Sequence, residues 1–446
     1  MNSRTEETEL GASALSKARW RLIPLLAICY CVAYIDRVNV SFASLQMNHD
    51  LHFSASVYGL GSGIFFLSYA SCEIPSNMMM LRFGARRWLS RIMVTWGGLA
   101  ICMVLVRTPL SFYVTRFLLG MAEAGFFPGV MYYLTLWFPR KIRAQTVSSF
   151  YIALPLSGTV MGSLAGFLLG LQGRLGLAGW QWLFLVEGIP AVLLGVVLWF
   201  VLPDGPSEAR WLNEAERGWL TRQMLADQTS VSGHGAGLGS ALLDLRVWQL
   251  GLFELCALTV LYAYSFMAPT MIQQATTLSI TEIGGVIAGL GVLGAVSMLV
   301  VGWLADRSSK SLGYIVFCTL TMAAGCVGVG TTRGGAPLIG SLALIVIGFY
   351  GLQGPFWALP ASFLSGASAA GGLALITMLG IFGGFIGPYG LGLAKDLTGD
   401  YRKSMVALGL LTAISLALIF NMARGRELSP KVMFEEPLVA NEGAVD

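Results

Sequence analysis

Twelve separate stretches of this 446-residue chain are long and apolar enough to cross a membrane as helices. An α-helix needs about 20 mostly apolar residues to span about 30 Å of hydrocarbon. In lipid, every backbone N–H and C=O needs a partner within the protein, which leaves only helices and closed barrels. The sequence therefore predicts an all-α membrane protein with spans at about 20–42, 57–80, 88–106, 111–136, 145–171, 180–202, 247–274, 283–305, 312–331, 337–359, 368–392 and 403–423.

The composition agrees with a surface that faces lipid. Only 12% of the residues are charged and 55% are hydrophobic, whereas a soluble domain carries about 25% charged residues. The net charge is +4 and no basic stripe with interleaved aromatic residues occurs, so we expect no nucleic-acid binding. The seven cysteines lie inside apolar runs, without C-x-x-C pairs or a nearby histidine, and we expect neither a metal site nor a cofactor.

Lysine and arginine predict the orientation of the spans. Basic residues gather before the first span and in the loops around 82–91, 140–143 and 307–310, which all lie on one side. The loop around 395–403 is the exception. By the positive-inside rule, we expect a multi-pass protein of the cell (inner) membrane with both termini in the cytoplasm. The first run lacks a small-residue cleavage site, so we interpret it as a retained span.

A charged segment divides the spans into two sets of six. We predict a bundle at 1–202, a cytoplasmic linker at 203–246 and a second bundle at 247–446. At an offset of 225 residues, the loop at 82–87 falls opposite 307–310, and the glycine pair 158/162 falls opposite 383/387. Chance matching is the alternative, because the chain has 55 glycines. Two parallel six-helix repeats are the plan of major facilitator transporters.

Several ionisable residues interrupt the apolar spans. A charge at the bilayer centre costs about 2.5–3.5 kcal/mol, so such residues are expected to face the bundle interior or a wet cavity. Arg116 and Glu123 are seven residues apart and share one helix face, whereas adjacent Asp36 and Arg37 diverge by about 100°. The alternative is a set of ion pairs that only fix helix packing. The residues concerned are Asp36, Arg37, Glu73, Arg116, Glu123, Glu187 and Glu254.

The two halves differ in their buried polar residues. At the offset of 225, the counterparts of Arg37, Arg116 and Glu123 are Tyr262, Ser341 and Gly348. We infer that the first half binds an anion and titrates, while the second shapes the pocket. Ordinary packing is the alternative for each aromatic residue. The polar and aromatic residues of the second half include Tyr262, Tyr264, Gln273, Gln353, Trp357, Ser362, Thr377 and Tyr389.

Five sequence blocks resemble the anion:cation symporter family of the major facilitator superfamily. Y-I-D-R-V-N at 34–39 is similar to the first-span signature, and R-F-L-L-G-M-A-E-A-G-F-F-P-G at 116–129 is similar to the fourth. E-I-P-S-N at 73–77, W-F-P at 137–139 and G-W-Q-W-L-F at 179–184 also fit. Within this family the chain looks most similar to bacterial uptake proteins for tartrate, galactonate and related organic acids.

The resemblance implies roles for individual residues. Arg37 would bind the substrate carboxylate, with Tyr34 beside it. Asp36 and Glu123 would carry protons, and Arg116 would modulate the pKa of a neighbouring acid. Two loops resemble the superfamily's cytoplasmic gating motif, although Leu81 stands where that motif has aspartate. The gating residues would be Arg82, Gly84, Arg86 and Arg87, with Gly302, Asp306 and Arg307.

The eleventh span departs from the family pattern, and this bears on the substrate. The family often has two asparagines where this chain has I-T-M-L-G-I-F-G-G-F at 376–385. Sugar acids need many hydrogen bonds, and a buried hydroxyl without a partner costs about 1–3 kcal/mol. We therefore expect a less hydroxylated acid. A short dicarboxylate or an aromatic carboxylate fits better than a hexonate.

These observations predict a monomeric, proton-coupled importer of a small organic anion that works by alternating access. Tyr262, Gln353, Trp357 and Thr377 would line the substrate pocket with Arg37 and Tyr34. An exporter or exchanger in the same fold is the main alternative, and a non-transporting sensor is another. We expect no enzyme, because the sequence has no Ser-His-Asp set, no H-E-x-x-H and no P-loop.

Overall fold

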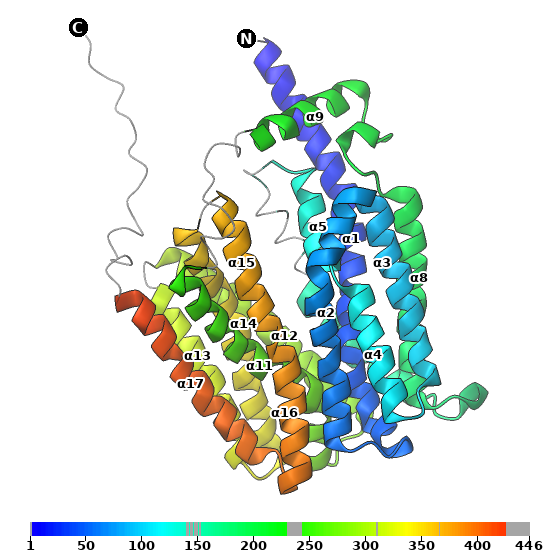
Figure 1. Ribbon diagram of the computed structural model, residues 1–446, viewed down its shortest axis with the longest axis vertical. Helices are drawn as coiled ribbons and strands as arrows, with labels where there is room; N and C mark the ends of the chain where they lie inside the picture. Colours follow the sequence, from blue (N-terminus) through cyan, green and yellow to red (C-terminus); the bar gives the residue numbers. More distant parts are fainter. Residues whose placement is uncertain are drawn as a thin grey trace.

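The computed structural model is a bundle of long helices that splits into two groups towards the end where the chain begins (Figure 1). It describes residues 2–139, 142, 146, 150, 153–229, 243–308, 311–364 and 366–424. No strand occurs within these ranges. One group contains α1 Asn2–Asp50, α2 Ala55–Phe83, α3 Ala85–Cys102, α4 Pro109–Glu123, α5 Phe126–Thr135, α7 Ala153–Leu169 and α8 Gly179–Val201.

The second group follows a short amphipathic helix, α9 Glu214–Thr229. Ten helices in the described part of the chain are long and apolar enough to cross a membrane; α2 is not one of these ten, and the described part of α7 is a shorter apolar helix. The prediction of an all-α membrane fold is confirmed. The second group contains α11 Leu245–Ala275, α12 Ile280–Arg307, α13 Ser311–Thr331, α14 Gly335–Phe363, α15 Gly366–Ile381, α16 Gly383–Thr398 and α17 Arg402–Arg424.

Two of the expected spans depart from a continuous α-helix. The fourth breaks between α4 and α5, where Gly125 adopts a φ of 86°. A side chain at this position would also meet the Ser76 hydroxyl, so glycine satisfies both requirements. The eleventh span is only locally tightened at Phe382, between α15 and α16, where the N–H of Phe382 bonds to the Leu379 carbonyl three residues earlier and the backbone stays helical. A hydropathy pattern cannot reveal such departures, because both sides of each remain apolar.

Helix α1 is longer than the expected span at about 20–42, because its polar N-terminal part packs against α9. The Lys17 ammonium lies 2.6 Å from a carboxylate oxygen of Glu216, and the Ser13 hydroxyl donates to the same oxygen at 2.7 Å. Glu216 is buried, and Gly11 leaves room for the Trp219 ring. Part of the predicted linker is therefore a helix that is docked on α1.

This docking contact predicts a pH-dependent stability. Burial raises the pKa of the Glu216 carboxyl, but the hydrogen bonds from Lys17 and Ser13 outweigh it and leave that pKa below its ordinary value. The stabilisation is then fully present above pH about 4.3, which is the pKa of a glutamate in the unfolded chain. It is lost as the pH falls through the lower pKa that Glu216 has in the folded protein. Because Lys17 is half-exposed, we expect Glu216→Gln to lower the free energy of unfolding by only about 1 kcal/mol at neutral pH.

Thermal unfolding of the purified protein across this pH range measures the effect. The difference between Glu216→Gln and the unsubstituted protein should shrink towards low pH. Glu214→Gln, at an exposed position of the same helix, is the matched control and should cause no such pH-dependent difference. A difference that persists at low pH would contradict the ion-pair interpretation.

The two groups of helices touch closely at the end opposite the N-terminus, through glycines. Gly59 of α2 faces the Pro388 carbonyl of α16, and Gly392 of α16 faces the Ala55 carbonyl of α2. Gly162 of α7 likewise faces the Gly284 carbonyl of α12. Small residues let helix backbones approach without intervening side chains. We call these α2–α16 and α7–α12 contacts the glycine seam.

A carboxylate strengthens the seam beside α2. Asp396 of α16 accepts hydrogen bonds from the backbone N–H groups of Ala55 and Ser56, at 3.1 and 2.8 Å. These N–H groups belong to the first turn of α2, which has no partners within its own helix and carries a partial positive charge. Asp396 therefore joins the two groups of helices at this end.

Removing this contact should loosen the seam. We expect Asp396→Ala to increase the exposure of the start of α2 about fivefold, since an exposed capping carboxylate contributes about 1 kcal/mol. The measurement is the labelling rate of a cysteine introduced at Ser56 by a membrane-impermeant maleimide. Asp400→Ala is the control, because the Asp400 carboxylate bonds locally, to the backbone N–H and the guanidinium of Arg402. Equal labelling rates in the two variants would contradict the proposed role of Asp396.

Candidate functional site

Arg37 lies in the middle of α1 and forms an ion pair with Glu123 of α4. The Arg37 side chain is 14% exposed and that of Glu123 only 1%. The guanidinium also stacks over the rings of Tyr69 and Phe65 of α2, at 5.1 and 5.7 Å from their centroids. The two residues on which the predicted site depends are thus in direct contact, and Arg37 is the more accessible partner.

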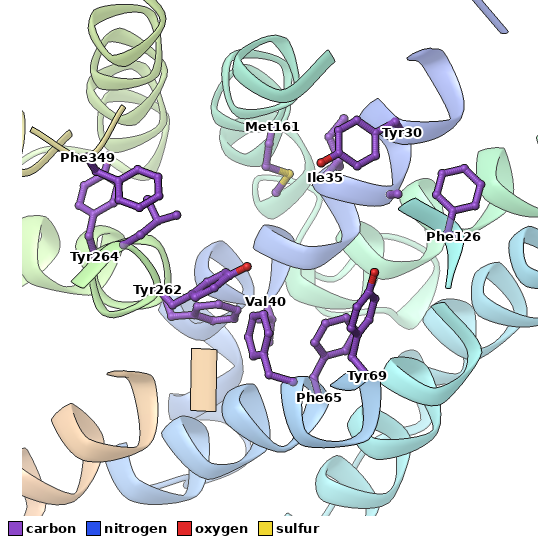
Figure 2. Packing of buried hydrophobic residues seen from close by; sticks show 14 of the residues in the cluster. Tyr30, Ile35, Val40, Phe65, Tyr69, Phe126, Met161, Tyr262, Tyr264 and Phe349 are labelled. Carbon is purple, nitrogen blue, oxygen red and sulfur yellow. The ribbon is translucent and has the colours of Figure 1, made fainter. Parts of the chain in front are cut away.

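Of the tyrosines near Arg37, three interact most strongly with its charge: Tyr262, Tyr69 and Tyr30. Tyr262 comes from α11 in the second group, and its ring packs 4.3 Å from that of Phe66. Figure 2 shows the three hydroxyls turned towards the space between these helices. The structure therefore brings the predicted residue Tyr262 to Arg37. Sequence reasoning missed Tyr30 and Tyr69, although Tyr69 lies one turn before the membrane-embedded Glu73.

Arg116 of α4 is fully buried behind Phe65. Its guanidinium lies 4.7 Å from the centroid of the Phe65 ring, on which Arg37 also stacks. Its Nε donates to the Gly61 carbonyl at 3.3 Å, and its two terminal nitrogens have no hydrogen-bond partner within the described residues. Arg116 interacts electrostatically with Asp36 and Glu123. A second cation is therefore held close to both acids without a tight ion pair.

Asp36 points away from Arg37, towards α3. Its carboxylate accepts hydrogen bonds from the Trp96 indole at 2.8 Å and from the Asn39 amide at 3.3 Å. The angular separation expected for adjacent helical residues places the two side chains in different surroundings. Glu187 of α8 is also buried in this region, and neither of its oxygens has a hydrogen-bond partner within the described residues.

The other predicted substrate-binding residues lie on the second group of helices, except Tyr34 of α1. Tyr34 interacts electrostatically with Tyr350, Tyr262 and Arg37. The Trp357 indole donates to the Gln353 amide oxygen at 3.0 Å, which leaves the Gln353 amide nitrogen without a described partner. The Thr377 hydroxyl donates to the Leu373 carbonyl of its own helix. No contact between described residues joins Gln353, Trp357 or Thr377 to Arg37.

The predicted gating residues lie where α2 meets α3 and at the end of α12. Gly84 has a φ of 86°, and a side chain there would meet the carboxylate of Asp204. Asp204 accepts from the backbone N–H of Arg86 at 2.7 Å. Arg82 and Arg307 each stack on a neighbouring aromatic ring, of Phe83 and Trp303, while Gly302 packs near Gly354. The Asp306 side chain lies outside the described residues.

Comparison with known proteins gives the family. The profile of the Major Facilitator Superfamily matches residues 26–388. The chain belongs to the major facilitator superfamily. It is therefore a multi-pass membrane transporter and not an enzyme, as the sequence predicts.

Relatives of this major facilitator cover nearly its whole length. A candidate tartrate transporter of Agrobacterium vitis is 41% identical over 97% of this chain and 95% of its own. A quinolone resistance transporter of Acinetobacter baumannii is 38% identical over 90% of this chain and 93% of its own. The name of the first relative supports the resemblance to tartrate-type transporters. The second relative is named for a different role, quinolone resistance.

Solved structures support the same fold at low sequence identity. A bacterial homologue of the lysosomal transporter Spinster, in an inward-facing and occupied conformation, is 17% identical, with a TM-score of 0.75 over 94% of this chain and 99% of its own. A D-xylose-proton symporter is 16% identical, with a TM-score of 0.70 over 90% of this chain and 96% of its own.

Proposed function

We propose that this major facilitator is a proton-coupled symporter that imports a small organic anion, of the tartrate-like dicarboxylate class, across the cell inner membrane by alternating access. The observation that carries the proposal is the Arg37–Glu123 ion pair, with Tyr262 of the other group of helices beside it. A single guanidinium between a titratable acid and an accessible space can bind either that acid or a substrate carboxylate.

The coupling follows from this exchange of partners. When Glu123 is ionised, it occupies Arg37. When Glu123 is protonated, its negative charge disappears, and a buried cation without a partner is costly. A substrate carboxylate then restores the charge balance by binding the planar guanidinium with two parallel hydrogen bonds. Proton uptake and anion binding thereby favour one another.

The neighbouring charges have supporting roles in this proposal. Asp36 is a second proton carrier, separated from Arg37 but close to the Arg116 charge. Arg116 adjusts the proton affinity of the two acids through its unpaired guanidinium nitrogens. The loops at Arg82–Arg86 and Gly302–Arg307 gate the cytoplasmic side. The division into bundles at 1–202 and 247–446, with both termini in the cytoplasm, belongs to the same proposal.

The residues near the second half of the pocket support a weakly hydroxylated substrate. Thr377 uses its hydroxyl within its own helix, and Gln353 already accepts from Trp357. Of these two residues, only the Gln353 amide nitrogen therefore remains for the hydroxyls of a sugar acid. The relatives named for tartrate transport support the dicarboxylate class.

An aromatic carboxylate, or efflux by anion exchange, is the second candidate. The rings of Phe65, Tyr69 and Tyr262 around Arg37 favour an aromatic substrate, and the quinolone resistance relative favours export. Both candidates would use the same guanidinium for the carboxylate.

Uptake into proteoliposomes tests the proposal. Labelled tartrate, phthalate, hydroxyphenylacetate and galactonate are supplied with and without an inward proton gradient. We expect tartrate to accumulate only with the gradient, and galactonate to be taken up poorly. Gradient-independent exchange, or preference for phthalate, would instead support the second candidate. No uptake of any of the four acids would contradict both.

A further inference from the structure

A cavity of about 920 Å³ lies outside the transport site, where α3 begins and α8 ends. Its walls come from the start of α3, the last turn of α8, the segment after α8 and the helix α9. Figure 1 shows this region at the end of the molecule where the chain begins. Arg86 and Arg87 also belong to the loop of the proposed cytoplasmic gate, but no residue proposed to bind substrate or protons lines this cavity. The chemistry of its other walls therefore needs a separate explanation.

Four arginines line the cavity with a single carboxylate, that of Glu208: Arg86, Arg87, Arg210 and Arg217. The Glu208 carboxylate is directed in part to the backbone N–H of Asp204, at 3.5 Å. Arg86 lies 3.7 Å from the Asp204 carboxylate. The cavity therefore keeps an excess of positive charge after its own pairs are counted.

The remaining arginines have unused donors. Arg87 and Arg210 are exposed and make no ion pair with any described residue. Arg217 donates from one terminal nitrogen to the Leu212 carbonyl at 3.1 Å, while its buried Nε has no partner within the described residues. Guanidinium groups with free donors match the oxygens of a phosphate, because they can form parallel hydrogen bonds.

The opposite wall of the cavity is apolar and belongs to a membrane-crossing helix. Trp199, Phe200 and Val201 form the end of α8 and are 48%, 79% and 57% exposed. Exposed aromatic side chains at the end of such a helix mark the boundary between lipid tails and head groups. The cavity therefore combines a basic wall with a wall that acyl chains can cover. A soluble phosphate would use only the first.

We propose that this cavity binds the head group of an anionic phospholipid, with its phosphate on Arg87, Arg210 and Arg217 and its acyl chains along Trp199 and Phe200. Basic pockets beside membrane-spanning helices are suited to such head groups. The bound lipid would connect α3 and α8 of the bundle to α9. This inference does not depend on which substrate the protein transports.

Binding of phosphatidylglycerol to the purified full-length chain in detergent, followed by native mass spectrometry, tests the proposal. We expect the double variant Arg87→Gln/Arg210→Gln to bind phosphatidylglycerol about 30-fold more weakly, at roughly fivefold for each arginine. The matched control is Arg174→Gln/Arg222→Gln, which removes the same charge from exposed positions outside the cavity and should retain the affinity. Equal losses in the two double variants would overturn the proposal.

Two further arms separate a lipid from a soluble anion. Phosphatidylcholine, which has no net charge, should bind weakly and equally to all variants. Phe200→Ser should weaken phosphatidylglycerol binding without changing the binding of inorganic phosphate. If inorganic phosphate displaces phosphatidylglycerol at equal concentration, or if Phe200→Ser has no effect on the lipid, the site is one for a free anion and the lipid proposal is wrong.

Discussion

Glu123→Gln is expected to abolish proton-driven accumulation while substrate exchange across the membrane continues. Glutamine keeps the size of the side chain but cannot carry a proton or neutralise Arg37. Arg37 then stays available to the substrate at every pH. A gradient of one pH unit can support about tenfold accumulation for each coupled proton, so the expected accumulation ratio for this variant falls towards one.

Two transport assays on the same proteoliposomes measure the effect: accumulation driven by a pH gradient, and counterflow with substrate on both sides. Glu73→Gln is the matched control, since Glu73 is half-buried on α2 and interacts with Arg37 through its charge without forming an ion pair. This control should keep both activities. If Glu123→Gln loses counterflow and accumulation equally, Glu123 is needed for more than proton transfer, and the proposed coupling is wrong.

Arg37→Lys should lower substrate affinity about 10- to 100-fold, even though the positive charge remains. Lysine cannot present two parallel donors to a carboxylate, and it cannot stack flat on Tyr69 and Phe65. A charge-assisted bidentate contact contributes roughly 1.5–3 kcal/mol, and the expected loss follows from this range.

Calorimetric titration of the purified protein with the preferred acid provides the affinity. Arg107→Lys is the control, because Arg107 is exposed in the segment before α4 and bonds to the backbone carbonyls of Val104 and Val106. A thermal unfolding scan verifies that both variants are folded. If the Arg37→Lys variant binds the acid as tightly as the unsubstituted protein does, Arg37 does not bind the carboxylate through two parallel hydrogen bonds.

The sequence predicts which residues belong to the site better than it predicts how those residues contact one another. A charge within an apolar span must have a physical reason to be there, so Arg37, Arg116 and Glu123 could be selected from their types and positions alone. Helical periodicity also separates Asp36 from Arg37, and the structure places them in different surroundings. The roles of these residues remain predictions.

Contacts between different helices could not be predicted in the same way. Tyr69 is an ordinary aromatic residue in an apolar span, and only the packing of α2 on α1 places it beside Arg37. Tyr30 lies on α1, seven residues before Arg37, so helical periodicity could have indicated it. Gln353 and Thr377 match the expected chemistry, yet their hydrogen bonds in the structure are made within the second group. Periodicity describes one helix at a time and carries no information about the distance between helices.

The glycine seam has a consequence for the rate at which the protein can turn over. Interlocked side chains would have to change rotamer and be re-solvated whenever the two groups of helices part, and each such step adds to the activation barrier. Where two backbones touch without intervening side chains, as Gly162 and Gly284 do, the helices can separate with almost no side-chain rearrangement. In the proposed alternating-access cycle, hydrogen bonds such as those of Asp396 would then be the main resistance to reopening at this end, and a few polar atoms would set the frequency of the cycle.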